Sequence, residues 1–159
     1  MTVPPLRAES RPGEVGVSFW LWISAVVLGA LGFVVSSLQV REIRDQAIQQ
    51  MLSQRPEMDP ATFERIMTIV IGVFFLIRLL FLVLETVFAF LMRGGRDWAR
   101  IVLTVFGAMT IAGELISLPS TRGLELVLGL IQLALVIGAI VYMYLPAANT
   151  WFQPRPAGF

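Results

Sequence analysis

Four long apolar runs constrain this chain more than any other feature of its sequence. They lie at about 17–40, 66–92, 98–118 and 124–145. Each is close to the ~20 residues that an α-helix needs to cross a bilayer. Backbone groups cannot stay unpaired in lipid, so helices are the expected form, and the alternating pattern of a membrane β-barrel is absent. We therefore expect an all-α membrane protein, a four-transmembrane-helix bundle.

The composition supports this class. The chain is 57% hydrophobic and 14% charged, whereas soluble domains carry about 25% charged residues. We expect a membrane domain at 15–152, between a disordered polar tail at 1–14 and a short tail at 153–159. The run at 17–40 is too long for the core of a signal peptide, about 7–15 residues, so we interpret it as a retained first span.

The connections between spans differ greatly in length. Tight turns join span two to span three and span three to span four. A long polar segment at 41–65 separates span one from span two. Residues 41–54 contain helix formers and no glycine or proline, which favours a helix that continues from span one. Pro56 should end it, and Asp59-Pro60 is typical of an N-cap followed by the first helical position. We predict an extended helical hairpin that protrudes from one membrane face.

The distribution of arginines indicates how the chain crosses the membrane. Three arginines within eight residues, in the turn between spans two and three, favour a cytoplasmic position for that turn. We therefore expect a cell-membrane protein with both termini in the cytoplasm. This places on the cytoplasmic side Arg7, Arg11, Arg93, Arg96, Arg100 and Arg155, and on the opposite side Arg41, Arg44, Arg55, Arg65 and Arg122.

Several classes of chemistry find no support in the residue types present. The chain has no cysteine and no histidine, which removes disulfides, thiolate nucleophiles and the usual zinc and haem ligands. The turn Arg93-Gly94-Gly95-Arg96 lacks the Lys-Ser/Thr pair of a phosphate loop. A net charge of +1 gives no electrostatic case for nucleic acid. We expect no enzyme activity, no cofactor and no metal site.

Span one carries a periodic seam of mostly small residues. Its members recur in alternating steps of four and three, and small residues allow helix backbones to approach closely in lipid. A helix-packing face is the favoured interpretation, and a ligand groove is the alternative. The seam consists of Ser18, Trp22, Ala25, Gly29, Gly32, Ser36 and Gln39.

Ionisable groups occur inside the predicted spans. Arg78 and Glu85 are seven residues apart on span two and share a face, while Glu114 lies on span three and Gln132 on span four. A central charge costs about 2.5–3.5 kcal/mol on insertion scales, so we expect Arg78 to be neutralised by Glu114, Glu85 or both. Such an intramembrane polar core either fixes helix pairing or forms a path for protons, ions or a small substrate.

A second group of polar and aromatic residues surrounds the turn between spans two and three. Arg93, Arg96, Trp98 and Arg100 lie where the chain leaves and re-enters the membrane. Arginine and tryptophan favour this interface, and the arginines are suited to anionic lipid headgroups.

Two stretches, RGGRDWARIVLTVFG at 93–107 and YLPAANTWF at 144–152, carry a family resemblance. With the FWLW start of span one, they resemble a group of small four-span membrane proteins of actinobacteria. The positions that match the motifs of this group are Trp98, Arg100, Pro146 and Asn149. The resemblance implies an integral membrane protein and no particular activity.

The function expected from the sequence is structural. We expect an integral membrane protein without catalytic activity, a structural or protein-interaction component of the cell envelope. Its partners would be the lipid bilayer and either a second copy of the chain or another membrane protein. The alternative is a small transporter or channel subunit that uses the Arg78/Glu85/Glu114 polar core. Small multidrug exporters place an essential glutamate in span one, and this span one has no acidic residue.

Overall fold

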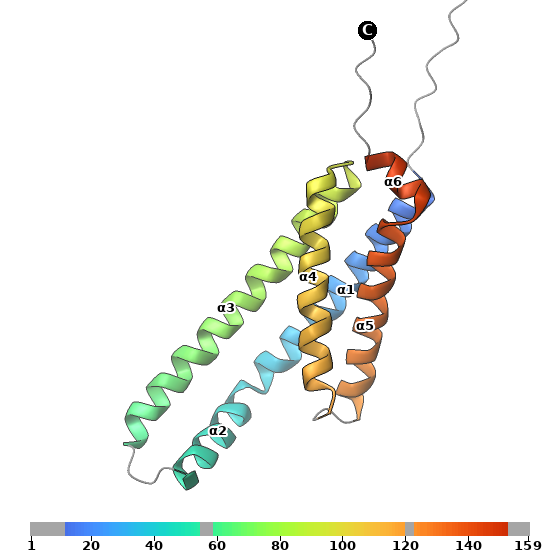
Figure 1. The fold of residues 1–159 in the computed structure, drawn as a ribbon. Helices are drawn as coiled ribbons and strands as arrows, with labels where there is room; N and C mark the ends of the chain where they lie inside the picture. Colours follow the sequence, from blue (N-terminus) through green and yellow to red (C-terminus); the bar gives the residue numbers. More distant parts are fainter. Residues whose placement is uncertain (1–11, 55–58, 120–122, 153–159) are drawn as a thin grey trace, which may run out of the picture. The chain divides into compact units, whose positions relative to one another are not determined.

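The computed structural model describes residues 12–54, 59–119 and 123–152 (Figure 1). Within these residues all regular structure is helical, which confirms the predicted all-α class. The helices are α1 (Gly13–Leu38), α2 (Val40–Gln54), α3 (Pro60–Arg93), α4 (Asp97–Ser117), α5 (Leu124–Met143) and α6 (Pro146–Phe152).

The four predicted spans correspond to α1, α3, α4 and α5, each long and apolar enough to cross a membrane. The helix ends agree with the predicted span ends to within a few residues, except where α1 and α3 start earlier. α1 begins at Gly13, inside the segment predicted to be a disordered tail. α3 has 34 residues, or about 51 Å at ~1.5 Å per residue, which exceeds a ~30 Å hydrocarbon core. The chain is therefore a multi-pass integral membrane protein.

The chain divides into two compact units, which we describe separately. The first contains the start of α1, the end of α3, and all of α4, α5 and α6. Parts of all four spans pack together here as a helical bundle around one hydrophobic core. Its buried residues are Val15, Phe19, Trp22, Ala25, Ala89, Met92, Ala99, Leu103, Val136, Ala139, Met143, Ala148 and Phe152.

Antiparallel pairing of α4 with α5 organises this first unit (Figure 1). Near the start of α4, the hydroxyls of Thr104 and Tyr144 lie 3.0 Å apart. One turn along, Gly107 lies against Val136. Near the far end, the Glu114 carboxylate lies against Gly129. These contacts set the register in which the polar residues of the two helices meet.

The turn between α3 and α4 ends α3 with a Schellman motif. The Arg96 N–H donates to the Leu91 carbonyl at 3.3 Å, and the Gly95 N–H donates to the Met92 carbonyl at 2.8 Å. Gly95 has φ of 84°, a conformation that favours glycine. The Trp151 indole of α6 packs tightly against Gly95, with its nitrogen 3.2 Å from the position a Cβ would take there. The glycine turn predicted from the sequence is thus also a docking surface for α6.

The second unit, Val26–Thr86, is a helical hairpin. The end of α1 bends at Gln39 and continues as α2, which lies beside the beginning of α3 (Figure 1). The rings of Phe33 and Phe75 meet edge to face at 5.2 Å, and Arg44 and Glu64 form an ion pair at 3.6 Å. The predicted continuation of span one is present, but as a separate helix after the bend. Pro56, Arg122 and both predicted tails beyond 12–152 lie outside the described residues.

Asp59 begins α3 as the sequence predicted. Its carboxylate accepts hydrogen bonds from the Thr62 backbone N–H at 3.0 Å and the Thr62 hydroxyl at 2.8 Å. It also accepts a longer bond from the Ala61 N–H at 3.4 Å. These bonds satisfy donors that the first turn of a helix leaves free. They stabilise the ionised carboxyl, so the pKa of Asp59 lies below its ordinary value of 3.8.

Candidate functional site

The predicted polar core is distributed over both units. Arg78 and Glu85 belong to the hairpin unit, and Glu114 and Gln132 belong to the bundle unit. In the hairpin unit the two polar residues share helix α3, whereas in the bundle unit they lie on the paired helices α4 and α5. The predicted pairing of Arg78 with Glu114 joins the two units and stays a prediction.

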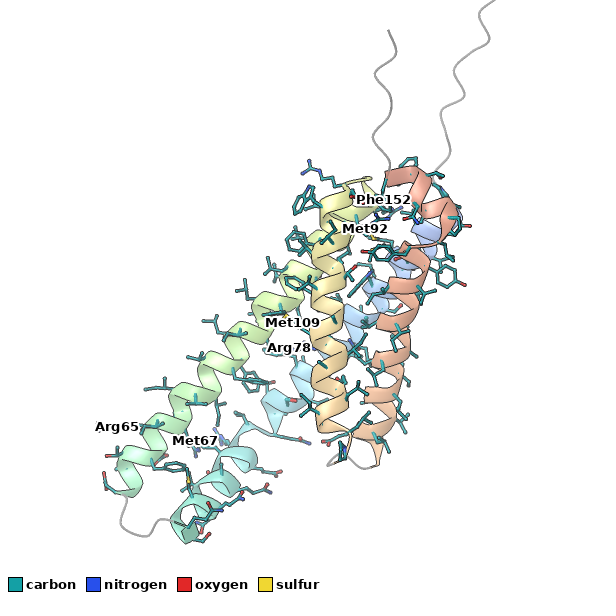
Figure 2. All side chains as sticks on the ribbon, viewed as in Figure 1. Arg65, Met67, Arg78, Met92, Met109 and Phe152 are labelled. Carbon is teal, nitrogen blue, oxygen red and sulfur yellow. The ribbon has the colours of Figure 1, made fainter. Side chains whose placement is uncertain are left out.

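Arg78 of α3 points toward α1 (Figure 2). One of its guanidinium nitrogens lies beside Gly29, 3.0 Å from the position a Cβ would take there. Leu82 contacts the same point at 3.2 Å. Because residue 29 has no side chain, α1 leaves room for a guanidinium between two apolar helices. The small residue and the charged residue are thus complementary in shape.

Glu85 follows Arg78 two turns along α3. It is only 5% exposed, which makes it the most buried acidic side chain among the described residues. Arg78 acts electrostatically on its carboxylate. A buried charge needs a partner, since desolvation costs several kcal/mol per ion. Arg78 is thus a basic group whose charge acts on Glu85 within the same helix, and neutralisation of the two charges stays a prediction.

Glu114 and Gln132 contribute a second polar cluster, between α4 and α5. A carboxylate oxygen of Glu114 lies 3.0 Å from the Cβ position of Gly129, one turn before Gln132 on α5. Gln132 is 8% exposed, and its side-chain oxygen has no hydrogen-bond partner within the described residues. An unpaired buried acceptor costs about 1–3 kcal/mol. The Glu114 and Gln132 side chains thus place polar groups inside the bundle, and the Gln132 oxygen is still able to accept a hydrogen bond.

The span-one seam divides by burial. Ala25 is 2% exposed and Gly29 is buried, whereas Gly32 and Ser36 are exposed. Nothing lies within 4 Å of the Cβ position of Gly32. The same face therefore meets other helices of the chain in its first half and leaves small residues uncovered in its second half.

Earlier seam residues show how close the packing is. The Ser18 hydroxyl donates a buried hydrogen bond to the Ala139 carbonyl at 2.8 Å. The ring of Trp22 lies 3.1 Å from the Cβ position of Gly107. Small residues on α1, α4 and α5 allow these approaches, as expected for helices that associate in lipid.

The four predicted interfacial residues occupy different surroundings. Arg93 lies over the ring of Phe19, 4.5 Å from its centroid. Trp98 is 49% exposed, and Arg96 is exposed as well. The Arg100 side chain is only 14% exposed. Contact of these residues with lipid headgroups stays a prediction.

Arg100 is the centre of a polar junction that joins α4 to α6. Its guanidinium forms an ion pair with Asp97 at 2.7 Å and donates to the Asn149 side-chain oxygen at 2.6 Å. It also lies over the rings of Tyr144 and Phe152, 4.6 and 4.9 Å from their centroids. The partly buried guanidinium thus has anionic, polar and aromatic partners at once.

Arg100 and Asn149 stand out in the sequence, but neither their contact nor helix α6 was predicted from it. A signal was present, because Pro146 suits the first position of a helix. The two residues also lie at the same end of the antiparallel α4/α5 pair. Residues at one end of such a pair can meet although 49 positions separate them.

In residues 12–54, 59–119 and 123–152, no group of three or more histidine, cysteine, aspartate or glutamate side chains could hold a metal ion. At the junction of α4 and α6, Arg100 instead pairs with the Asp97 carboxylate and the Asn149 amide.

The chain matches no protein-family model, and comparisons with curated proteins and with solved structures give no significant match. The resemblance to small four-span membrane proteins therefore rests on the motifs of the chain itself.

Proposed function

We propose that this membrane protein is a non-enzymatic component of the cell envelope that acts through helix contacts with other membrane proteins or with copies of itself. The proposal rests on the small-residue seam of α1, which is buried in its first half and exposed in its second half. Gly32 and Ser36 continue the small-residue periodicity, yet both are exposed. In lipid, such residues allow a second helix to approach closely. The exposed half of the seam is therefore suited to a helix from outside the chain.

Substitution within the seam tests this proposal. Gly32→Leu adds a side chain where no atom lies within 4 Å, so the protein itself should still fold. Gly113→Leu is the matched control, since Gly113 is exposed on α4 and also has open space. We expect crosslinking in native membranes to capture a partner. Gly32→Leu should reduce the yield of the crosslinked product, and Gly113→Leu should not. Equal yields from both variants would contradict a seam contact.

A crosslinking experiment also distinguishes the two kinds of partner. Two differently tagged copies of the chain can be expressed together and crosslinked in the same membrane. Recovery of both tags in one product supports self-association, whereas recovery of one tag with a second protein supports a heteromeric contact. If neither product forms, the contact proposal fails.

A small transporter or channel subunit is the second candidate. It is favoured by Gln132, whose unpaired oxygen is buried one turn from the place where Glu114 approaches α5. Intramembrane ionisable residues often mark proton or ion pathways. Purified protein in liposomes should then conduct protons or ions, and Glu114→Gln should reduce the flux. Flux equal to that of empty liposomes would exclude this candidate.

We also propose that both termini lie in the cytoplasm. The short turn between α3 and α4 contains Arg93 and Arg96, with Arg100 shortly after it. Basic residues in short loops favour the cytoplasmic side. The hairpin of α2 and the start of α3 would then project from the opposite face.

A further inference from the structure

A groove of about 390 Å³ lies within the hairpin unit, between the α1–α2 bend and α3. The bend at Gln39 interrupts the helix between Ser37 and Val40, two residues that line the groove. On the opposite side, Gly72 of α3 contributes no side chain. Nothing lies within 4 Å of its Cβ position, so the space beside it is open. A volume of this size is typical of small-ligand sites, about 300–1,000 Å³.

The groove changes character along its length. Its apolar end is lined by Ile71 and Phe75 of α3, and its basic end by Arg41 and Arg44 of α2. The contacts of the hairpin establish this order, because Phe75 meets Phe33 of α1 while Arg44 meets Glu64 near the start of α3. The groove therefore runs from the apolar helices toward the charged hairpin.

The two arginines differ in how they are engaged. Arg44 forms ion pairs with Asp45 at 3.2 Å and Glu64 at 3.6 Å. Arg41 is exposed and makes no hydrogen bond or ion pair with any residue that the structure describes. A guanidinium can bind a phosphate through two parallel N–H donors. Arg41 thus presents an exposed guanidinium beside an apolar groove.

We propose that the groove binds one anionic phospholipid of the surrounding leaflet. The phosphate group lies on the Arg41 guanidinium, and the beginning of an acyl chain follows Ile71 and Phe75. Charge complementarity and the change from basic to apolar lining favour this occupant. A soluble anion would satisfy Arg41 but would leave the apolar end without a ligand.

Native mass spectrometry of the full-length protein in detergent tests the proposal. The probes are phosphatidylglycerol, phosphatidylcholine and inorganic phosphate. We expect phosphatidylglycerol to bind more tightly than phosphatidylcholine. Arg41→Gln should weaken this binding about fivefold, the equivalent of about 1 kcal/mol for one basic residue. Gly72→Leu should weaken it further, because the new side chain fills the groove.

Arg65→Gln is the control for charge. Arg65 is exposed on the same hairpin and points away from α2 (Figure 2), and it does not line the groove. It should retain wild-type affinity for phosphatidylglycerol. Equal losses for Arg41→Gln and Arg65→Gln would overturn the proposal, as would equal affinity for the two lipids. Full displacement by millimolar inorganic phosphate would also overturn it in favour of a simple anion site. If Gly72→Leu does not fold, the comparison of the two arginine variants decides alone.

Discussion

At the scale of single residues, glycines determine where large side chains can lie. Gly107 of α4 faces the Trp22 ring, and a Cβ there would lie 2.8 Å from Ile140 and 3.1 Å from Val136. Gly113 lies on the same helix but has open space. The same residue type therefore serves close packing at one position and not at the other.

This difference predicts a contrast between two alanine variants. Gly107→Ala should destabilise the bundle by about 1–3 kcal/mol, because it overpacks a site that has no free volume. Gly113→Ala should be neutral or stabilising, since alanine is the better helix former. Unfolding in mixed detergent micelles measures both free energies. Similar effects of the two substitutions would contradict the proposed close contact at Gly107.

The charged residues of α3 support a second prediction at this scale. Arg78→Leu should destabilise the protein by up to about 3 kcal/mol, because it leaves the buried Glu85 carboxylate without its counter-charge. Adding Glu85→Leu should recover much of the loss.

A second double variant, Arg78→Leu with Glu114→Leu, tests the pairing expected from the sequence. Recovery in this variant would support the pairing, and its absence would contradict it. If neither double variant recovers stability relative to Arg78→Leu, charge neutralisation is not the role of Arg78. The measurement is again the free energy of unfolding in mixed micelles.

At the scale of helices, polar contacts at the ends decide where each helix begins and what it binds. α6 has only seven residues, too few to be stable alone in water. It is held by contacts with other elements, above all the bond from Arg100 to Asn149 and the packing of Trp151 on Gly95. Its formation therefore depends on tertiary structure.

We predict that Arg100→Gln releases α6. The substitution removes an ion pair and a charge-assisted hydrogen bond, the latter alone contributing about 1.5–3 kcal/mol. Amide hydrogen exchange across Pro146–Phe152 should become much faster. Arg96→Gln is the matched control, because Arg96 is exposed in the preceding turn. Unchanged protection of α6 in Arg100→Gln would contradict the role of this junction.

The start of α3 gives a prediction that depends on pH. Folding lowers the pKa of Asp59 below its unfolded value, which is near 3.8. The hydrogen bonds to the Asp59 carboxylate therefore stabilise α3 fully at pH values above the unfolded pKa. This stabilisation is lost as the pH falls through the folded pKa. Exchange protection of the Thr62 amide should decline over that acidic range. Asp59→Asn keeps a capping oxygen but cannot titrate, so its protection should not follow pH in the same way. A pH response identical in both proteins would show that another group is responsible.

At the scale of the whole molecule, the four spans determine how the chain meets the membrane. Their surfaces carry exposed apolar side chains, including Leu76 at 67% and Phe74 at 65%. In water such surfaces would aggregate, whereas in lipid they are in contact with a solvent of matching polarity. We expect the four spans of the described residues, an even number, to place the start of α1 and the end of α5 on the same side of the membrane.

We predict that this side is the cytoplasm. A C-terminal reporter that is active only outside the cytoplasm should be silent, and a reporter inserted in the hairpin between α2 and α3 should be active. Replacing Arg93 and Arg96 by glutamine should weaken this preference, because the positive-inside rule depends on basic residues in short loops. An active C-terminal reporter on the wild-type protein would reverse the proposed orientation.

The sequence alone was sufficient to predict the spans, the tight glycine turn and the Asp59 cap, because each depends on local composition. Lipid requires helices wherever about 20 apolar residues occur together, and an N-cap depends on its own first turn. Hydropathy does not specify how far each helix rotates or which residues it faces. Tertiary structure therefore decided that Arg100 contacts Asn149, that Arg78 lies beside Gly29 and that a groove opens next to Arg41, because these depend on the register between helices distant in sequence.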